Sequence, residues 1–387
     1  MRLGSFVALL IGILLPGCSS GPSEEIALGD QLLIEGKAEE ALGHYQAAVE
    51  QDPDDLDARL RIARVHLALG REAEARAALD EAVLRADAER ARVLVRGAEV
   101  LLDAGASQVA LGWLQERAGP DAQDPEVLAM RGRAELDLGR IAEAVATFES
   151  AAGDRTDPRR LALLGTSYYL AGLQELARAA RGSDQAEIEA SRRRAASPLS
   201  EAKNPLQEAR YLDPSNASVH LSLGQLHHQA GRFEEAMLEY RLARRLAPGN
   251  PEPALVMGGV HFEQGRYEEA LADLEEARRL GAAERASFFL GMTYWAMKRP
   301  AESMGAFGQA LAAHPELERQ VLAWMAQRRS ENVPALIDLV DSEDAQVAAG
   351  SVRLLRGLSG QDLGGDEAAW REWWTSQEAR PGSDPDR

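Results

Sequence analysis

Residues 217–250 read ASVHLSLGQLHHQAGRFEEAMLEYRLARRLAPGN, and this stretch decides the fold. Apolar and small residues recur every three or four positions on each side of Gly231, as in two amphipathic helices joined by a glycine turn. Gly224 lets the two helices approach closely, and Tyr240 fills the space beside it. Pro248 prevents the second helix from continuing. The stretch therefore predicts one antiparallel helical hairpin.

The same pattern recurs along the chain with a period of about 34 residues. Small residues at the position of Gly224 follow one another at Gly29, Ala63, Gly97, Gly132, Gly165, Gly224, Gly258 and Gly291. The steps between them are 34, 34, 35, 33, 59, 34 and 33 residues. A fixed period of this length is typical of a solenoid built from helix pairs, a class of protein that binds other proteins.

This pattern resembles the tetratricopeptide repeat family. The first copy places small, aromatic and proline residues at Gly29, Gly36, Ala41, Tyr45, Ala48 and Pro53. The resemblance implies an all-α fold, a right-handed α-solenoid of about eight hairpins over residues 24–315. Residues 316–376, where the period stops, resemble a short HEAT-like helical cap. In this family the first helix of each hairpin lines a concave groove, which implies a protein-binding scaffold without a cofactor.

One step of the period is too long. Between Gly165 and Gly224 it measures 59 residues, which indicates an insertion at about 178–202. We interpret this insertion as an extended helical hairpin or a mobile loop on one rim, because insertions in solenoids map to one face. Its three consecutive arginines, 192–194, make it either part of a solvated spacer or a basic docking patch on an acidic protein.

Residues 1–17 have the pattern of a secretory signal peptide, with Arg2 before a short apolar run. The run is too short for a stable membrane span. It ends in Leu15-Pro16-Gly17-Cys18, which resembles the lipobox of bacterial lipoproteins. That resemblance implies acylation of Cys18, the only cysteine, a tether over residues 18–23, and anchorage in the outer membrane facing the periplasm. The alternative is a plain secreted protein with a chance cysteine.

The charge of the chain excludes one class of partner. The formal net charge is −19, and 45% of the residues are hydrophobic but only 5% aromatic. A surface this acidic repels phosphate backbones, so we expect no binding of nucleic acid. The composition favours close-packed helices over a sheet core.

The resemblance also predicts which residues face the groove. Side chains spaced by four and then three residues share one helix face. On the first helices this gives the candidate groove residues Tyr169, His228, Phe262, Phe288, Met292 and Trp295. Large apolar side chains in a groove can anchor an extended peptide or a helix. The alternative is that the stripe only packs neighbouring first helices against each other.

Some family members hold a C-terminal carboxylate with lysines in the groove. The matching positions here are Ile26, Leu60, Leu94, Ala129, Ala162, Leu221, Leu255 and Phe288. None of them is lysine, so the groove is expected to prefer apolar contacts.

The C-terminal segment ends in an aromatic cluster, Trp370, Trp373 and Trp374. Trp370 and Trp374 are four residues apart and share a helix face. They either plug the open end of the solenoid, which needs a cap, or form a partner-binding or membrane-dipping cluster. Residues 377–387 are rich in Pro, Gly and Asp, and we expect them to be disordered.

Catalytic patterns are weak in this chain. It has no phosphate-binding loop, nucleophile elbow or HExxH motif. His220, His227 and His228 cluster in sequence and leave a metal-dependent enzyme as one alternative. His66, His227 and His261 occupy a position that the repeat usually gives to an aromatic, which favours core histidines and no metal.

Together these patterns predict a lipid-anchored periplasmic scaffold and not an enzyme. Its expected partners are other proteins of the cell envelope, in pilus and secretin assembly, outer-membrane protein insertion or recruitment of peptidoglycan enzymes. A structural envelope protein that self-associates through the Trp370–Trp374 end is the second alternative.

Overall fold

The computed structural model describes residues 24–86, 89–181 and 184–378. All regular elements within these ranges are helices, so the prediction of an all-α repeat fold is confirmed there. The chain divides into two compact units, residues 1–214 and 215–387. The predicted signal peptide, tether, Cys18 and nearly all of the predicted tail lie outside the described residues.

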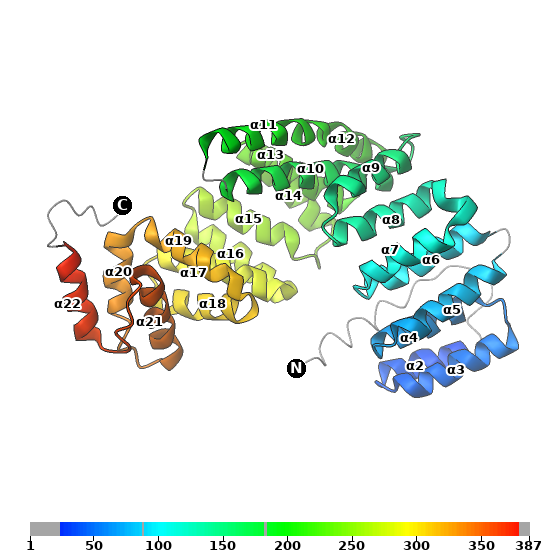
Figure 1. Cartoon of the computed structure of the whole chain (residues 1–387), viewed down its shortest axis with the longest axis horizontal. Helices are drawn as coiled ribbons and strands as arrows, with labels where there is room; N and C mark the ends of the chain where they lie inside the picture. Colours follow the sequence, from blue (N-terminus) through cyan, green and yellow to red (C-terminus); the bar gives the residue numbers. More distant parts are fainter. Residues whose placement is uncertain (1–23, 87–88, 182–183, 379–387) are drawn as a thin grey trace. The chain divides into compact units, whose positions relative to one another are not determined.

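Unit 1 is a row of helical hairpins that follow one another along the chain (Figure 1). Its first four hairpins are α2 (Glu24–Ile34) with α3 (Ala38–Gln51), α4 (Leu56–Ala68) with α5 (Glu72–Arg85), α6 (Arg90–Asp103) with α7 (Ser107–Arg117), and α8 (Pro125–Asp137) with α9 (Ile141–Ala151). A short 3-10 helix, Gly119–Gln123, precedes α8. Asp55 and Asp124 accept backbone N–H bonds at the starts of α4 and α8, which explains why these helices begin there.

The predicted insertion is helical. The fifth hairpin pairs α10 (Pro158–Arg181) with α11 (Gln185–Glu201) and α12 (Lys203–Leu212). Helix α10 has 24 residues, whereas α8 has 13. The additional turns extend the hairpin by about 16 Å, at 1.5 Å per residue. Of the two interpretations of the insertion, the extended hairpin is the one that the structure shows.

Unit 2 contains three further hairpins and a C-terminal group of helices. The hairpins are α13 (Ala217–Gln229) with α14 (Phe233–Leu246), α15 (Glu252–Glu263) with α16 (Tyr267–Ala277), and α17 (Ala283–Ala296) with α18 (Pro300–Ala313). A kink at Gly281, where φ is 106°, separates α16 from α17, and a 3-10 helix, Pro315–Leu317, follows α18. The last four helices are α19 (Glu318–Ala326), α20 (Arg329–Ile337), α21 (Ala345–Ser359) and α22 (Glu367–Glu378).

The repeated glycines lie where two helices of a hairpin approach most closely. A Cβ atom at Gly132 would lie 2.7 Å from the ring of Phe148, and one at Gly97 would lie 2.6 Å from the ring of Trp113. Real Cβ atoms do not approach other atoms so closely, so only glycine fits without a shift of the neighbouring helix. The turn glycine Gly231 has a φ of 70°, a conformation that favours glycine. The period of about 34 residues in the sequence therefore marks the positions at which the two helices of each hairpin pack most closely.

The C-terminal helices share one core with the last hairpin. Val347, Leu354 and Leu355 of α21 are buried, as their spacing predicts. The cluster continues through Phe307 of α18 to Trp370 of α22. Helices α19–α22 thus cover the last hairpin of unit 2.

Candidate protein-binding surface

In unit 2, the predicted groove residue His228 is half-buried on α13. Its Nε2 lies 2.8 Å from Oε2 of Glu263 on α15, the next first helix. Its ring packs on Phe233 of the same hairpin, with centroids 5.7 Å apart. His228 therefore links neighbouring first helices and is also accessible to a partner.

Phe262, Phe288 and Met292 also remain partly exposed on first helices of unit 2. The ring of Phe262 packs on Tyr267, with centroids 5.7 Å apart, and Phe288 packs on Phe307 at 6.4 Å. Each aromatic ring is thus held by the second helix of its own hairpin. Fixed rings with an exposed part are suited to anchor a partner, because little side-chain entropy is lost on binding.

Two predicted groove residues are buried instead. Trp295 is 9% exposed, and its indole N–H donates to Oδ1 of Asn332 at 2.7 Å. Tyr169 is 5% exposed on α10. The placement of these two side chains in an accessible groove is therefore wrong. For Trp295 the physical reason is that α19–α22 cover the last hairpin and bring Asn332 to its indole N–H.

The C-terminal tryptophans are mainly core residues. Trp370 is fully buried and Trp374 is 7% exposed, whereas Trp373 is partly exposed. Arg329 lies over the Trp373 ring, with its guanidinium carbon 5.9 Å from the centroid. This arrangement favours the interpretation of these residues as a cap.

The three histidines considered as metal ligands have separate partners. Nδ1 of His220 lies 2.6 Å from Oε2 of Glu239, and both side chains are buried in the α13–α14 hairpin. His228 instead interacts with Glu263, as above. Within residues 24–86, 89–181 and 184–378, no group of three His, Cys, Asp or Glu side chains could hold a metal ion. No observation on the described residues therefore favours the metal-enzyme alternative.

Unit 1 has a feature that the sequence analysis missed, a group of arginines on α4 and α6. Arg61 pairs with Asp30 at 2.9 Å, and Arg96 pairs with Asp57 at 2.7 Å. Arg64, which lies one turn after Arg61, has no carboxylate within ion-pair distance among the residues that the structure describes. The signal in the sequence was the three-residue spacing of Arg61 and Arg64 on one first helix.

The electrostatic environment of Arg64 is unfavourable to its charge. Partial burial is the largest effect, and it lowers the pKa of the guanidinium from its usual value. Arg61 and Arg96 lower the pKa further, whereas Asp103 and Glu99 act in the opposite direction. An additional negative group near Arg64 would therefore be stabilising.

A hollow of about 390 Å³ adjoins this group between α6 and the start of α8. Its lining residues are Ala91, Arg92, Val95, Arg96, Glu99, Asp124 and Glu126. Arg96 and Glu99 thus belong both to the hollow and to the surroundings of Arg64.

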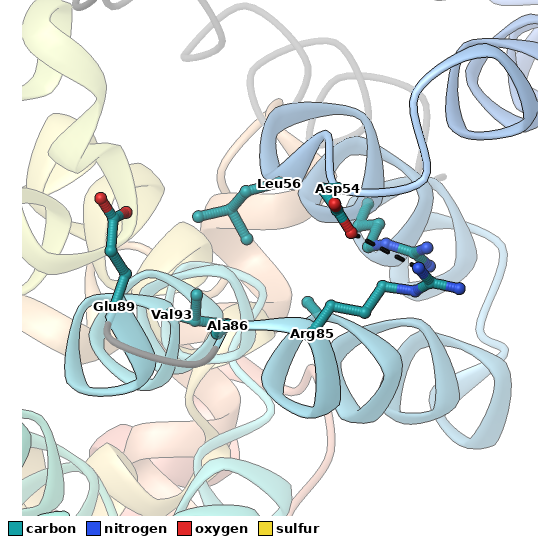
Figure 2. Close-up of a pocket in the computed structure, with 8 residues that line it drawn as sticks. Asp54, Leu56, Arg85, Ala86, Glu89 and Val93 are labelled. Atoms are coloured by element: carbon teal, nitrogen blue, oxygen red, sulfur yellow. Dashed lines mark hydrogen bonds and ion pairs between the residues drawn. The ribbon is translucent and has the colours of Figure 1, made fainter.

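A smaller cavity of about 170 Å³ lies where α5 leads into α6 in unit 1 (Figure 2). The Arg85 guanidinium points toward the Asp54 carboxylate at 3.4 Å. Arg59 donates to the carbonyl of Pro53 at 2.7 Å. Glu89, at the opposite side of the cavity in Figure 2, pairs with Arg92 at 2.9 Å. Since its charged groups already have partners, this cavity has no evident ligand.

Comparison with known families decides the classification. Models of the tetratricopeptide repeat match residues 32–96, 129–198, 189–251 and 255–318, more than half of the chain. The chain belongs to the tetratricopeptide repeat family. This membership confirms the resemblance inferred from the glycine period and makes the protein a scaffold of the protein-interaction type. No curated protein sequence matches the chain.

The comparison with solved structures finds several that are similar to this tetratricopeptide repeat protein. Human IFIT1, solved as a dimer with m7Gppp-AAAA, is 15% identical, with a TM-score of 0.55, covering 92% of this chain and 84% of that one. A thermophilic tetratricopeptide repeat protein from Thermus thermophilus is 20% identical, with a TM-score of 0.43, covering 54% and 99%. One from Parabacteroides merdae is 12% identical, with a TM-score of 0.45, covering 75% and 91%. At 15% identity, the similarity to human IFIT1 concerns the fold alone.

Proposed function

We propose that this tetratricopeptide repeat protein is a membrane-anchored periplasmic scaffold that binds protein partners and helps to assemble or recruit an envelope machine. The observation that carries the proposal is the row of partly exposed side chains, His228, Phe262, Phe288 and Met292, on consecutive first helices of unit 2. Pilus and secretin assembly, outer-membrane protein insertion and recruitment of peptidoglycan enzymes are the processes that a scaffold of this type would serve.

The proposed anchor rests on the sequence Leu15-Pro16-Gly17-Cys18. Several acyl chains on one cysteine hold a protein firmly on a membrane, because each buried methylene contributes about 0.8 kcal/mol. Among the described residues, no helix has the length and apolar character needed to cross a membrane. On the strength of the sequence before Cys18, we propose its lipid as the attachment, with the repeats facing the periplasm.

Cys18→Ser is expected to release the protein from membranes, because serine cannot form the thioether to the lipid. Fractionation of cells should move most of the protein from the membrane pellet to the soluble fraction, and labelling with a palmitate analogue should disappear. Ser19→Ala, which keeps the cysteine, serves as the control and should remain membrane-bound. Sedimentation of the Cys18→Ser protein with carbonate-washed membranes would refute the anchor.

Phe262→Ala is expected to weaken partner capture about tenfold, in the range of a truncated interface anchor. The measurement is affinity capture from envelope extract with the full chain in detergent, followed by quantitative mass spectrometry. Leu238, which is 55% exposed on the second helix α14, provides the matched control as Leu238→Ala. If both variants capture the same proteins in the same amounts, the first helices are not the binding surface.

A further inference from the structure

Two first helices of unit 1, α4 and α6, carry a net positive charge in a strongly acidic chain. Helix α4 carries three arginines against one aspartate, and α6 carries three arginines against two carboxylates. The second helices beside them have the opposite balance, since α3 has three glutamates and no Lys or Arg, and α5 has four carboxylates against two arginines. In a chain with a formal charge of −19, positive charge in this part of unit 1 is thus concentrated on α4 and α6.

Most of the charged groups on this face are already committed to a partner. Arg61 pairs with Asp30, and Arg96 with Asp57. At the far rim of the hollow, Asp124 caps α8, and Glu126 lies 3.6 Å from Arg160. Arg64 remains the guanidinium without an ion-pair partner among the described residues of this face.

We propose that the α4–α6 face of unit 1 binds an acidic segment of a protein partner, with a side-chain carboxylate of that segment on the guanidinium of Arg64. This inference rests on the proposed scaffold function and names the class of segment that the scaffold recognises. A guanidinium and a carboxylate form two parallel charge-assisted hydrogen bonds, which are stronger than neutral ones. Ala91 and Val95 line the adjoining hollow and can receive an apolar side chain next to the acidic one.

The surroundings of Arg64 favour a peptide over a nucleic acid. Glu99 and Asp103 flank the arginine and would repel the closely spaced phosphates of a nucleic-acid backbone. A single carboxylate within an otherwise apolar segment pairs with one guanidinium and experiences less of this repulsion than a run of phosphates. The bound group is a side chain in the middle of a segment, so an amidated C-terminus is not expected to prevent binding.

The test uses an array of 15-residue peptides with amidated C-termini, probed with the full chain in detergent. Each peptide with one central Asp or Glu is paired with its Asn or Gln counterpart. We expect the acidic peptides to bind about tenfold more tightly than their amide counterparts, the effect of one charge-assisted hydrogen-bonded pair. Arg64→Gln should remove this preference and leave the binding of the amide peptides unchanged.

Two further variants separate recognition from folding. Glu99→Gln removes the negative charge beside Arg64, has nearly the same shape, and is expected to strengthen binding of the acidic peptides several-fold. A gain of binding cannot result from misfolding. Arg193→Gln, which removes an arginine with an 82% exposed side chain on α11, is the matched control and should behave as the unmodified chain.

Three outcomes would overturn the inference. The first is an acidic preference that persists in Arg64→Gln, and the second is the absence of any acidic preference. The third is capture of a labelled single-stranded RNA oligonucleotide that depends on Arg64. Capture of neutral peptides through Phe262 alone would overturn this inference but support the scaffold function, so the failures of the two proposals can be distinguished.

Discussion

Trp370→Ala is expected to lower the free energy of unfolding of unit 2 by about 3–5 kcal/mol, the range for large aromatic truncations in a core. The side chain is fully buried, and its indole N–H donates to the carbonyl of Gly364 at 2.9 Å. Its ring also meets Trp373 edge-on, with centroids 5.7 Å apart. Removing the Trp370 side chain leaves a cavity between α22 and the helices that α22 covers. Urea unfolding followed by circular dichroism would measure the loss.

Trp373→Ala provides the control for this prediction, because Trp373 lies on the same helix and is partly exposed. We expect it to cost less than Trp370→Ala, since part of its surface already contacts water. Comparing the stability of the two variants decides whether the C-terminal tryptophans act as a cap or as a docking cluster. Unchanged stability of Trp370→Ala together with lost partner capture would show that the cluster binds a partner.

Trp295→Ala is expected to destabilise unit 2 by a similar amount, about 3–5 kcal/mol. The ring is buried in the core shared by α17 and the C-terminal helices. Its N–H bonds Asn332, which in turn donates to the carbonyl of Met325 at 2.7 Å. The substitution therefore removes both apolar contacts and one partner of a buried amide, and a buried polar group without its partner is costly.

Partner capture and urea unfolding of Trp295→Ala should be measured in parallel. Met292→Ala is the matched control for unfolding only, since Met292 lies one turn earlier on α17, is partly exposed and belongs to the proposed binding surface. We expect the control to retain most of the stability. If Trp295→Ala instead unfolds like the unmodified chain but fails to capture partners, then Trp295 acts at the binding surface after all.

The hairpins were predictable because one physical requirement repeats. Each hairpin needs a small residue opposite a large one, as at Gly132 and Phe148, and this requirement fixes the period of the sequence. The number of hairpins and the helical character of the chain followed from it. Their handedness stays a prediction.

The candidate site was less predictable, because side-chain spacing shows which face a residue shares but not what covers that face. Trp295 has the spacing of a groove residue, yet the C-terminal helices cover it, and they begin where the period ends. Arg64 was missed because the pairing of arginines depends on contacts between residues far apart in sequence, as between Arg61 and Asp30. The repeat period of the sequence does not show which arginine forms an ion pair with which carboxylate.

The long hairpin of α10 and α11 has a mechanical consequence. The shorter hairpins from α4 to α9 each pack against the hairpin before and the hairpin after them, whereas α11 packs mainly on α10. At its base, Leu206 of α12 packs against Gly165. Under a pulling force, the outer turns of this hairpin are therefore expected to unfold locally while its base stays folded. This segment would unfold before the neighbouring repeats.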